Sequence, residues 1–224
     1  MLTRPRLTTL CFAAAAALLL GSTGCTDLDE ASAAGITHDN LLSELSVQLA
    51  RVTGLTYTAT YQLTGGGTAT VTQAQKPART AYVYPGGRLI ESTTGTVRCA
   101  RDACTETDPT PATATPLAGS MLITPEAALT MLNTAALDQE LDATQHDTTI
   151  AGRHATCLDL DGVDGTPTRK FSLCVTNEGA LGSFAATIAG ERYEQALTTY
   201  AEKAAPDAFD LPATAKLTDK RTNR

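Results

Sequence analysis

Six cysteines carry the most distinctive chemistry in this chain of 224 residues. Cys25 follows a run of small residues, while Cys99 and Cys104, and likewise Cys157 and Cys174, form pairs that are close in sequence. A thiol can accept a lipid, form a disulfide or bind a metal. The segments around each cysteine decide among these reactions.

The N-terminal segment has the layout of a secretory signal peptide. Arg4 and Arg6 precede an apolar run over residues 10–20. That run is too short to span a bilayer as a helix, which takes ~20 residues. We therefore expect residues 1–24 to be a signal peptide that directs export and is then removed.

The residues before Cys25 resemble a bacterial lipobox. Residues 21–24 are small and lead directly to Cys25, although Ser22 stands where an aliphatic residue is usual. The resemblance implies a diacylglyceryl group on Cys25 and a place at the cell membrane, facing outside the cytoplasm. Two acyl chains anchor a protein stably without charge attraction. The alternative is an ordinary signal peptide followed by an incidental cysteine.

The segment after Cys25 is small and acidic, so residues 25–36 are interpreted as a lipidated cysteine and a flexible tether. The formal charge of the chain is −7; removal of residues 1–24 takes away two basic residues and no acid, which leaves −9. Such a chain lacks the positive surface that nucleic acid needs, and anionic lipid headgroups repel it.

The four remaining cysteines are expected to form two disulfides, since an exported protein meets an oxidising compartment. Cys157 and Cys174 flank the loop 161–169, whose Gly, Asp, Thr and Pro residues suit a hairpin. Cys99 and Cys104 are predicted to close a tight turn. A zinc site would need all four ligands to converge, and the two pairs are far apart in sequence, so no metal is expected.

The register of the predicted hairpin can be checked against its apolar pattern. If Cys157 faces Cys174, then Leu158 faces Leu173 and Leu160 faces Phe171. One face of the hairpin is then apolar and the disulfide lies on the other, which is the pattern of a half-buried antiparallel pair.

The apolar periodicity predicts an α+β fold. Helical spacing covers residues 37–52, a helix is expected to start at Thr124-Pro125-Glu126, and a second helical piece over 137–143. Alternation predicts strands over 55–63, 68–74, 78–84, 88–91, 94–100, 147–152 and 181–188. Residues 191–200 fit a helix or a strand, and the preceding turn favours a strand. Because such strands need one covered face, we expect a curved antiparallel sheet packed over the helices.

Apart from the cysteines, the chain shows little catalytic chemistry. The run Asp159–Asp164 lacks the glycine and the final glutamate of a calcium loop. His38, His146 and His154 are far apart and form no metal-binding pair. Because no nucleophile or phosphate-loop motif is present either, we expect no enzyme and no cofactor.

The remaining candidate site is the apolar face of the predicted sheet. This face is either plain core or the wall of a ligand cavity, since such cavities are mostly apolar with a few polar groups. Its residues are Tyr57, Tyr61, Leu63, Val71, Leu158, Leu160, Phe171 and Leu173.

Several features together resemble the LolA/LppX-like group of bacterial lipoproteins. They are the lipobox at 22–25, the helix at 37–52, the segment Tyr57–Tyr61, the segment Thr149–Arg153 and the segment Phe209–Pro212. The resemblance spans about residues 37–215, leaving 216–224 as a polar tail. It implies a half-barrel over helices with a hydrophobic cavity, in proteins that carry lipids or lipoprotein acyl chains or bind glycolipids.

Two functions follow as expectations. The first is a membrane-anchored lipoprotein that binds a lipid, glycolipid or other amphiphile in an apolar cavity between sheet and helices. The alternative is a non-enzymatic sensor or protein-interaction lipoprotein with a closed core. An enzyme of unrecognised type is a third, less favoured reading.

Overall fold

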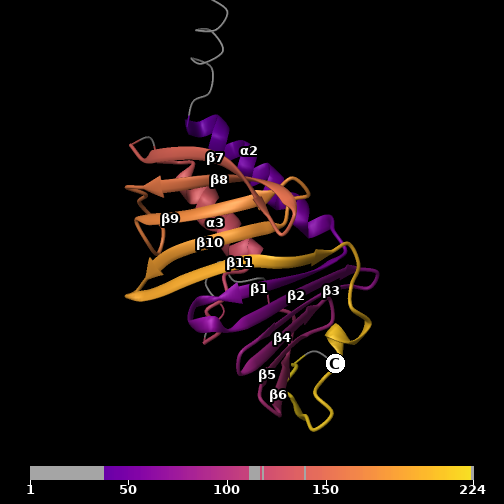
Figure 1. Ribbon diagram of the computed structural model, residues 1–224. Coiled ribbons are helices and arrows are strands. Elements are labelled where there is room, and N and C mark those ends of the chain that lie inside the picture. The colour runs from indigo at the N-terminus through magenta and orange to yellow at the C-terminus, as the bar shows by residue number, and fades with distance from the viewer. Residues whose placement is uncertain (1–37, 111–116, 118, 139, 223–224) are drawn as a thin grey trace, which may run out of the picture. The chain divides into compact units, whose positions relative to one another are not determined.

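The computed structural model describes residues 38–110, 117, 119–138 and 140–222. Within them, twelve strands form one sheet in the order β12-β6-β5-β4-β3-β2-β1-β11-β10-β9-β8-β7. Neighbouring strands are antiparallel except β12 and β6, which are parallel. Figure 1 shows β7–β11 stacked beside the two helices, with β1–β6 continuing the sheet beyond β11.

The strands have the following bounds: β1 Tyr57–Leu63, β2 Thr68–Gln75, β3 Ala78–Tyr84, β4 Gly87–Ser92, β5 Thr96–Ala100, β6 Ala103–Thr107, β7 Asp142–Ile150, β8 Arg153–Asp161, β9 Lys170–Thr176, β10 Leu181–Ile188, β11 Glu191–Ala201 and β12 Lys216–Asp219. The helices are α2 His38–Ala50 and α3 Pro125–Ala135, with 3₁₀ turns η1 Arg51–Gly54, η2 Thr64–Gly66 and η3 Pro206–Phe209.

The predicted fold class is wrong. The described residues form a largely β fold with two short α-helices of 13 and 11 residues, not an α+β domain whose sheet packs over a helical layer. One reason is the segment predicted as a helix over 137–143, where Leu137 lies in a turn and β7 begins at Asp142. The helix-packed part of the core therefore lies next to β8–β10, and not along the whole sheet.

Other elements agree with their sequence patterns. The alternation in β1 puts Tyr57, Ala59, Tyr61 and Leu63 on a buried face. Residues 191–201 are a strand, as the preceding turn favoured. Strands β6 and β12 were not predicted, and β12 brings part of the expected polar tail into the sheet.

Both predicted disulfides are confirmed. Cys157 pairs with Cys174 directly across β8 and β9, and the neighbouring pairs have the predicted register. Cys99 and Cys104 pair across β5 and β6, on either side of a two-residue turn at Arg101 and Asp102.

The core lies on one face of the sheet, here called the inner face. One continuous row on this face crosses five strands from β8 to β1, through Leu158, Leu173, Phe184, Gln195 and Leu63. The opposite face is called the outer face.

The inner face carries two groups of packed side chains. The helix cluster joins α2 and α3 to β8–β10 and contains Leu42, Leu45, Leu49, Ala128, Leu132, Leu158, Leu160, Phe171, Leu173 and Phe184 among others. The tyrosine cluster lies on β1–β4 and contains Tyr57, Ala59, Tyr61, Leu63, Ala69, Val71, Tyr82, Tyr84, Leu89, Leu197, Val52, Leu117 and Leu122. No helix among the described residues has the length and apolarity to cross a membrane.

The start of α3 has strong local signals. The Thr124 hydroxyl accepts a hydrogen bond from the backbone N–H of Ala127 at 3.1 Å, and Pro125 occupies the first helical position. Glu126 lies in the first turn, where the helix dipole favours a negative charge. This cap fixes the point at which the irregular segment before α3 ends.

The chain after β11 crosses the outer face before it forms β12. This segment, residues 202–215, is called the C-terminal strap. Figure 1 shows it in yellow, running from the end of β11 past β3 toward β6. Thr58 contacts Lys203 and Ala205 through its hydroxyl, and the Arg88 guanidinium donates to the Asp210 carbonyl. The strap therefore covers part of the outer face of β1–β4.

Candidate functional site

The eight residues of the predicted apolar site all lie on the inner face and are buried. Their exposed fractions range from 0% for Leu173 to 5% for Leu63. The structure does not bring them into one group. Tyr57, Tyr61, Leu63 and Val71 belong to the tyrosine cluster, and the other four belong to the helix cluster.

Gln195 lies between the two clusters, in the same row as Leu63 and Phe184. It is 4% exposed, and its amide forms two hydrogen bonds with the backbone of Ile123. Its oxygen accepts from the Ile123 N–H at 2.8 Å, and its nitrogen donates to the Ile123 carbonyl at 3.0 Å. Gln195 thus holds the segment before α3 against the inner face.

The described part of that segment, Leu117 and residues 119–124, covers part of the tyrosine cluster without forming a helix. Leu117 and Leu122 pack into the cluster and are almost completely buried. The Ser120 hydroxyl donates to the Leu117 carbonyl at 2.7 Å and accepts from the Leu122 N–H at 3.0 Å. The cover is therefore a local turn that Gln195 fastens to the sheet.

Three tyrosines bring hydroxyl groups to this apolar surface. Tyr61 donates to the Leu181 carbonyl at 2.9 Å, and Tyr82 donates to a Glu126 carboxylate oxygen at 3.2 Å. Tyr57 stacks on Tyr200 with 5.6 Å between ring centroids. Burial raises the pKa of Tyr57, Tyr61 and Tyr82 well above the usual value, so all three hydroxyl groups are neutral.

An acidic pair borders the tyrosine cluster. Burial, followed by the negative charge of Glu126, raises the pKa of the Glu91 carboxyl to about 7, against a lowering effect of Arg98. The sequence reasoning missed this pair. Alternation in β4 was the available signal, because it places Glu91 on the same face as Leu89.

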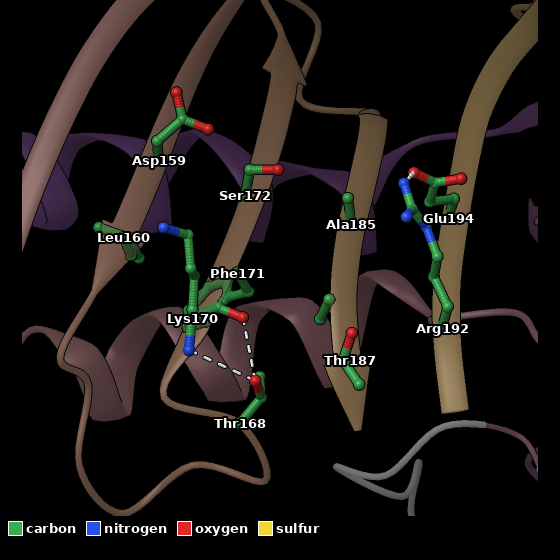
Figure 2. A pocket seen from close by; sticks show the side chains of 11 residues that line it. Asp159, Leu160, Thr168, Lys170, Phe171, Ser172, Ala185, Thr187, Arg192 and Glu194 are labelled. Atoms are coloured by element: carbon green, nitrogen blue, oxygen red, sulfur yellow. Dashed lines mark hydrogen bonds and ion pairs between the residues drawn. The ribbon is translucent and has the colours of Figure 1, made fainter. Parts of the chain in front are cut away.

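The outer face carries a shallow groove of about 420 Å³ across β8–β11. Figure 2 shows its floor, where the small residues Ser172 and Ala185 lie between two charged walls. Lys170 forms an ion pair with Asp161 at 2.9 Å on one side, and Arg192 pairs with Glu194 on the other. Opposite charges are thus paired on each wall, which leaves little net charge for a ligand.

A second hollow of about 410 Å³ continues this groove over β1. The two share Ala185 and Glu194. The Thr64 hydroxyl closes its side by accepting from the Glu194 N–H at 2.7 Å. Together they make a long, weakly polar surface on the outer face.

The acidic run considered for calcium forms two exposed ion pairs with neighbouring cations. Asp164 pairs with Arg169, Asp161 with Lys170, and Asp159 lies 3.5 Å from His146. Among the described residues, no three His, Cys, Asp or Glu side chains come together in a way that could hold a metal ion. Cys25, the predicted lipidation site, lies outside the described residues.

Comparison with known proteins gives limited information. No family matches the chain, and no curated protein matches it. Its structure is similar to that of an uncharacterised conserved protein from Thermus thermophilus, with a TM-score of 0.48 and 10% identity over 80% of this chain and 98% of that one. It is also similar to PNGF-II, with a TM-score of 0.37 and 12% identity over 75% of this chain and 32% of that one. Neither similarity informs the function of this chain.

Proposed function

We propose that this protein is a lipid-anchored lipoprotein outside the cytoplasm that binds a lipid or other amphiphile against the inner face of its sheet. The lipobox resemblance at Cys25 and the signal-peptide layout before it support the anchor. The two disulfides agree with an oxidising compartment.

The observation that carries the binding proposal is the cover of the tyrosine cluster. Three buried tyrosines and several aliphatic residues lie under a short irregular segment, and Gln195 supplies two of its hydrogen bonds to the sheet. An acyl chain can take the place of Leu117 and Leu122 on this surface. The Glu91 carboxyl and the hydrogen-bonded pair of Tyr82 and Glu126 border this surface, and a polar headgroup would lie against them.

The alternative function is a sensor or protein-interaction lipoprotein with a closed core. The near-complete burial of all eight predicted ligand residues favours it, because a filled core needs no ligand. Recognition would then take place on the outer face, where the long groove over β8–β11 and β1 lies.

Lipid extraction distinguishes the two functions. The full chain is expressed in a bacterial host with its disulfides formed, purified in mild detergent, and extracted with organic solvent for mass spectrometry. The binding proposal predicts one non-covalent lipid per chain, in addition to the acyl groups that stay attached to Cys25. A clean extract, together with no thermal stabilisation by added fatty acids or phospholipids, would favour the closed-core alternative.

A further inference from the structure

We propose that a groove between the C-terminal strap and the ends of β2 and β3 binds an anion that carries phosphate oxygens. The groove has a volume of about 560 Å³. It lies beside the outer face and shares no residue with the inner-face site. The inference therefore does not depend on the proposed function above.

Three cationic side chains line this groove. Lys76 lies in the turn between β2 and β3, Arg79 on β3, and Lys203 in the strap. None of the three forms an ion pair with any described residue, whereas Arg153, Lys170 and Arg192 all do. The cations of the groove therefore keep their charge available.

One acidic residue lines the groove, and it forms no ion pair with these three cations. Glu202 instead lies 3.5 Å from the Arg153 guanidinium, outside the groove lining. The chain as a whole has a formal charge of −7. A cavity whose three cations lack an ion-pair partner among the described residues is therefore an exception on an acidic protein, and it attracts anions locally.

Arg79 is the central group of the proposed site. Its guanidinium carbon lies 3.9 Å from the centroid of the Phe209 ring, so the strap supports one side of it. Its Nε is buried and has no hydrogen-bond partner within the described part of the chain. A buried donor without an acceptor is unfavourable, and the guanidinium fork matches the oxygens of a phosphate group. A small rotation of the side chain would turn this Nε toward the groove, where an oxyanion supplies the missing acceptor.

The walls next to these cations are apolar. Phe209 and Pro206, with the alanines beside them, line the groove on the side of the strap. The same phosphate chemistry can come from a phospholipid headgroup or from a soluble phosphate. The apolar wall gives a phospholipid additional contacts that inorganic phosphate lacks.

Calorimetry with two probes tests the proposal. The full chain carrying Cys25→Ser, which removes the anchor, is titrated with inorganic phosphate and with monomeric dihexanoyl phosphatidic acid. The test variant combines Arg79→Gln and Lys203→Gln. The control combines Lys216→Gln and Lys220→Gln, which change the net charge equally at and just after β12. The single variant Lys203→Gln provides a test that leaves the Arg79–Phe209 contact intact.

The proposal predicts that the double variant binds the probes at least tenfold more weakly, Lys203→Gln severalfold more weakly, and the control within twofold of the parent. Tighter binding of phosphatidic acid than of phosphate would identify a lipid headgroup, and equal binding would identify a soluble anion. The proposal is overturned if neither probe binds, or if the control and the groove variants lose affinity equally.

Discussion

Gln195 is a buried polar residue whose two hydrogen bonds join an irregular segment to a strand. Its amide matches both polar groups of one residue, the N–H and the carbonyl of Ile123. Without this pairing both groups would be buried and unsatisfied, which is unfavourable. The side chain therefore determines how firmly the cover of the tyrosine cluster is held.

Replacing Gln195 with Leu keeps the approximate size of the side chain but removes both hydrogen bonds. We expect the free energy of unfolding to fall by about 2 kcal/mol, because two backbone groups lose their partners. Urea denaturation followed by circular dichroism measures the change. Gln145→Leu, at an exposed position of β7, is the matched control and should have little effect. Equal stability of the two variants would contradict this role of Gln195.

The raised pKa of Glu91 predicts that the stability of the fold depends on pH. Its pKa is about 7 in the folded protein against a usual value of 4.5, so the folded state holds a proton that the unfolded chain releases between these values. The stabilisation is present below pH 4.5 and is lost as the pH rises through 7. Because Glu91 is only partly buried, solvent screening reduces the effect to about 1 kcal/mol.

Glu91→Gln removes this dependence by keeping the side chain neutral. We expect the variant to be more stable than the parent at about pH 8 and of equal stability near about pH 4, in denaturation curves recorded at both values. Glu44→Gln, at an exposed position of α2, serves as the control for the loss of one negative charge. A parent and a Glu91 variant with parallel pH profiles would show that Glu91 is already charged in the fold.

At the scale of elements, local patterns determined most of the strands. The register of the β8–β9 hairpin could be predicted because an apolar face and a cysteine pair agree on one alignment. The segment 137–143 was mistaken for a helix because its few apolar residues fit both periods. Strand β6 has no apolar alternation of its own, and its pairing with β5 across the Cys99–Cys104 turn defines it.

The two disulfides should differ in their contribution to stability. Cys157–Cys174 closes a loop with a sequence separation of 17, and Cys99–Cys104 one of 5. The loss of chain entropy in the unfolded state predicts about 3 kcal/mol for the first and about 2 kcal/mol for the second. Denaturation of the two double-alanine variants tests this order. A larger loss of stability in the variant that lacks Cys99–Cys104 would mean that local packing, and not loop length, dominates.

At the scale of the whole sheet, the sequence predicted which residues lie on the buried face, but not that they fall into two separate clusters. It grouped eight residues on one face, and all eight are there. It could not show that the helices pack mainly next to β8–β10, because the segment that covers part of the tyrosine cluster is irregular and has no periodicity. Strand β12 was missed because it pairs with β6, which is distant from it in sequence.

A larger side chain placed in one cluster at a time shows which of the two clusters binds the lipid. Ala69 in the tyrosine cluster and Ala128 in the helix cluster are both almost completely buried. Replacing each with Leu overpacks its surroundings and costs about 1–3 kcal/mol. We expect Ala69→Leu to reduce the amount of co-purified lipid and Ala128→Leu to leave it unchanged, as measured by quantitative mass spectrometry of folded protein. An equal reduction in both would place the ligand elsewhere.

The most direct test of ligand binding at the inner face is photocrosslinking with a palmitic acid that carries a diazirine near its methyl end. The purified full chain is irradiated with this probe, digested, and mapped by mass spectrometry. We expect crosslinks on the β1 and β2 residues of the tyrosine cluster and on the segment next to α3 that contains Leu122. Crosslinks confined to the outer face, or none above the level of a denatured sample, would contradict it.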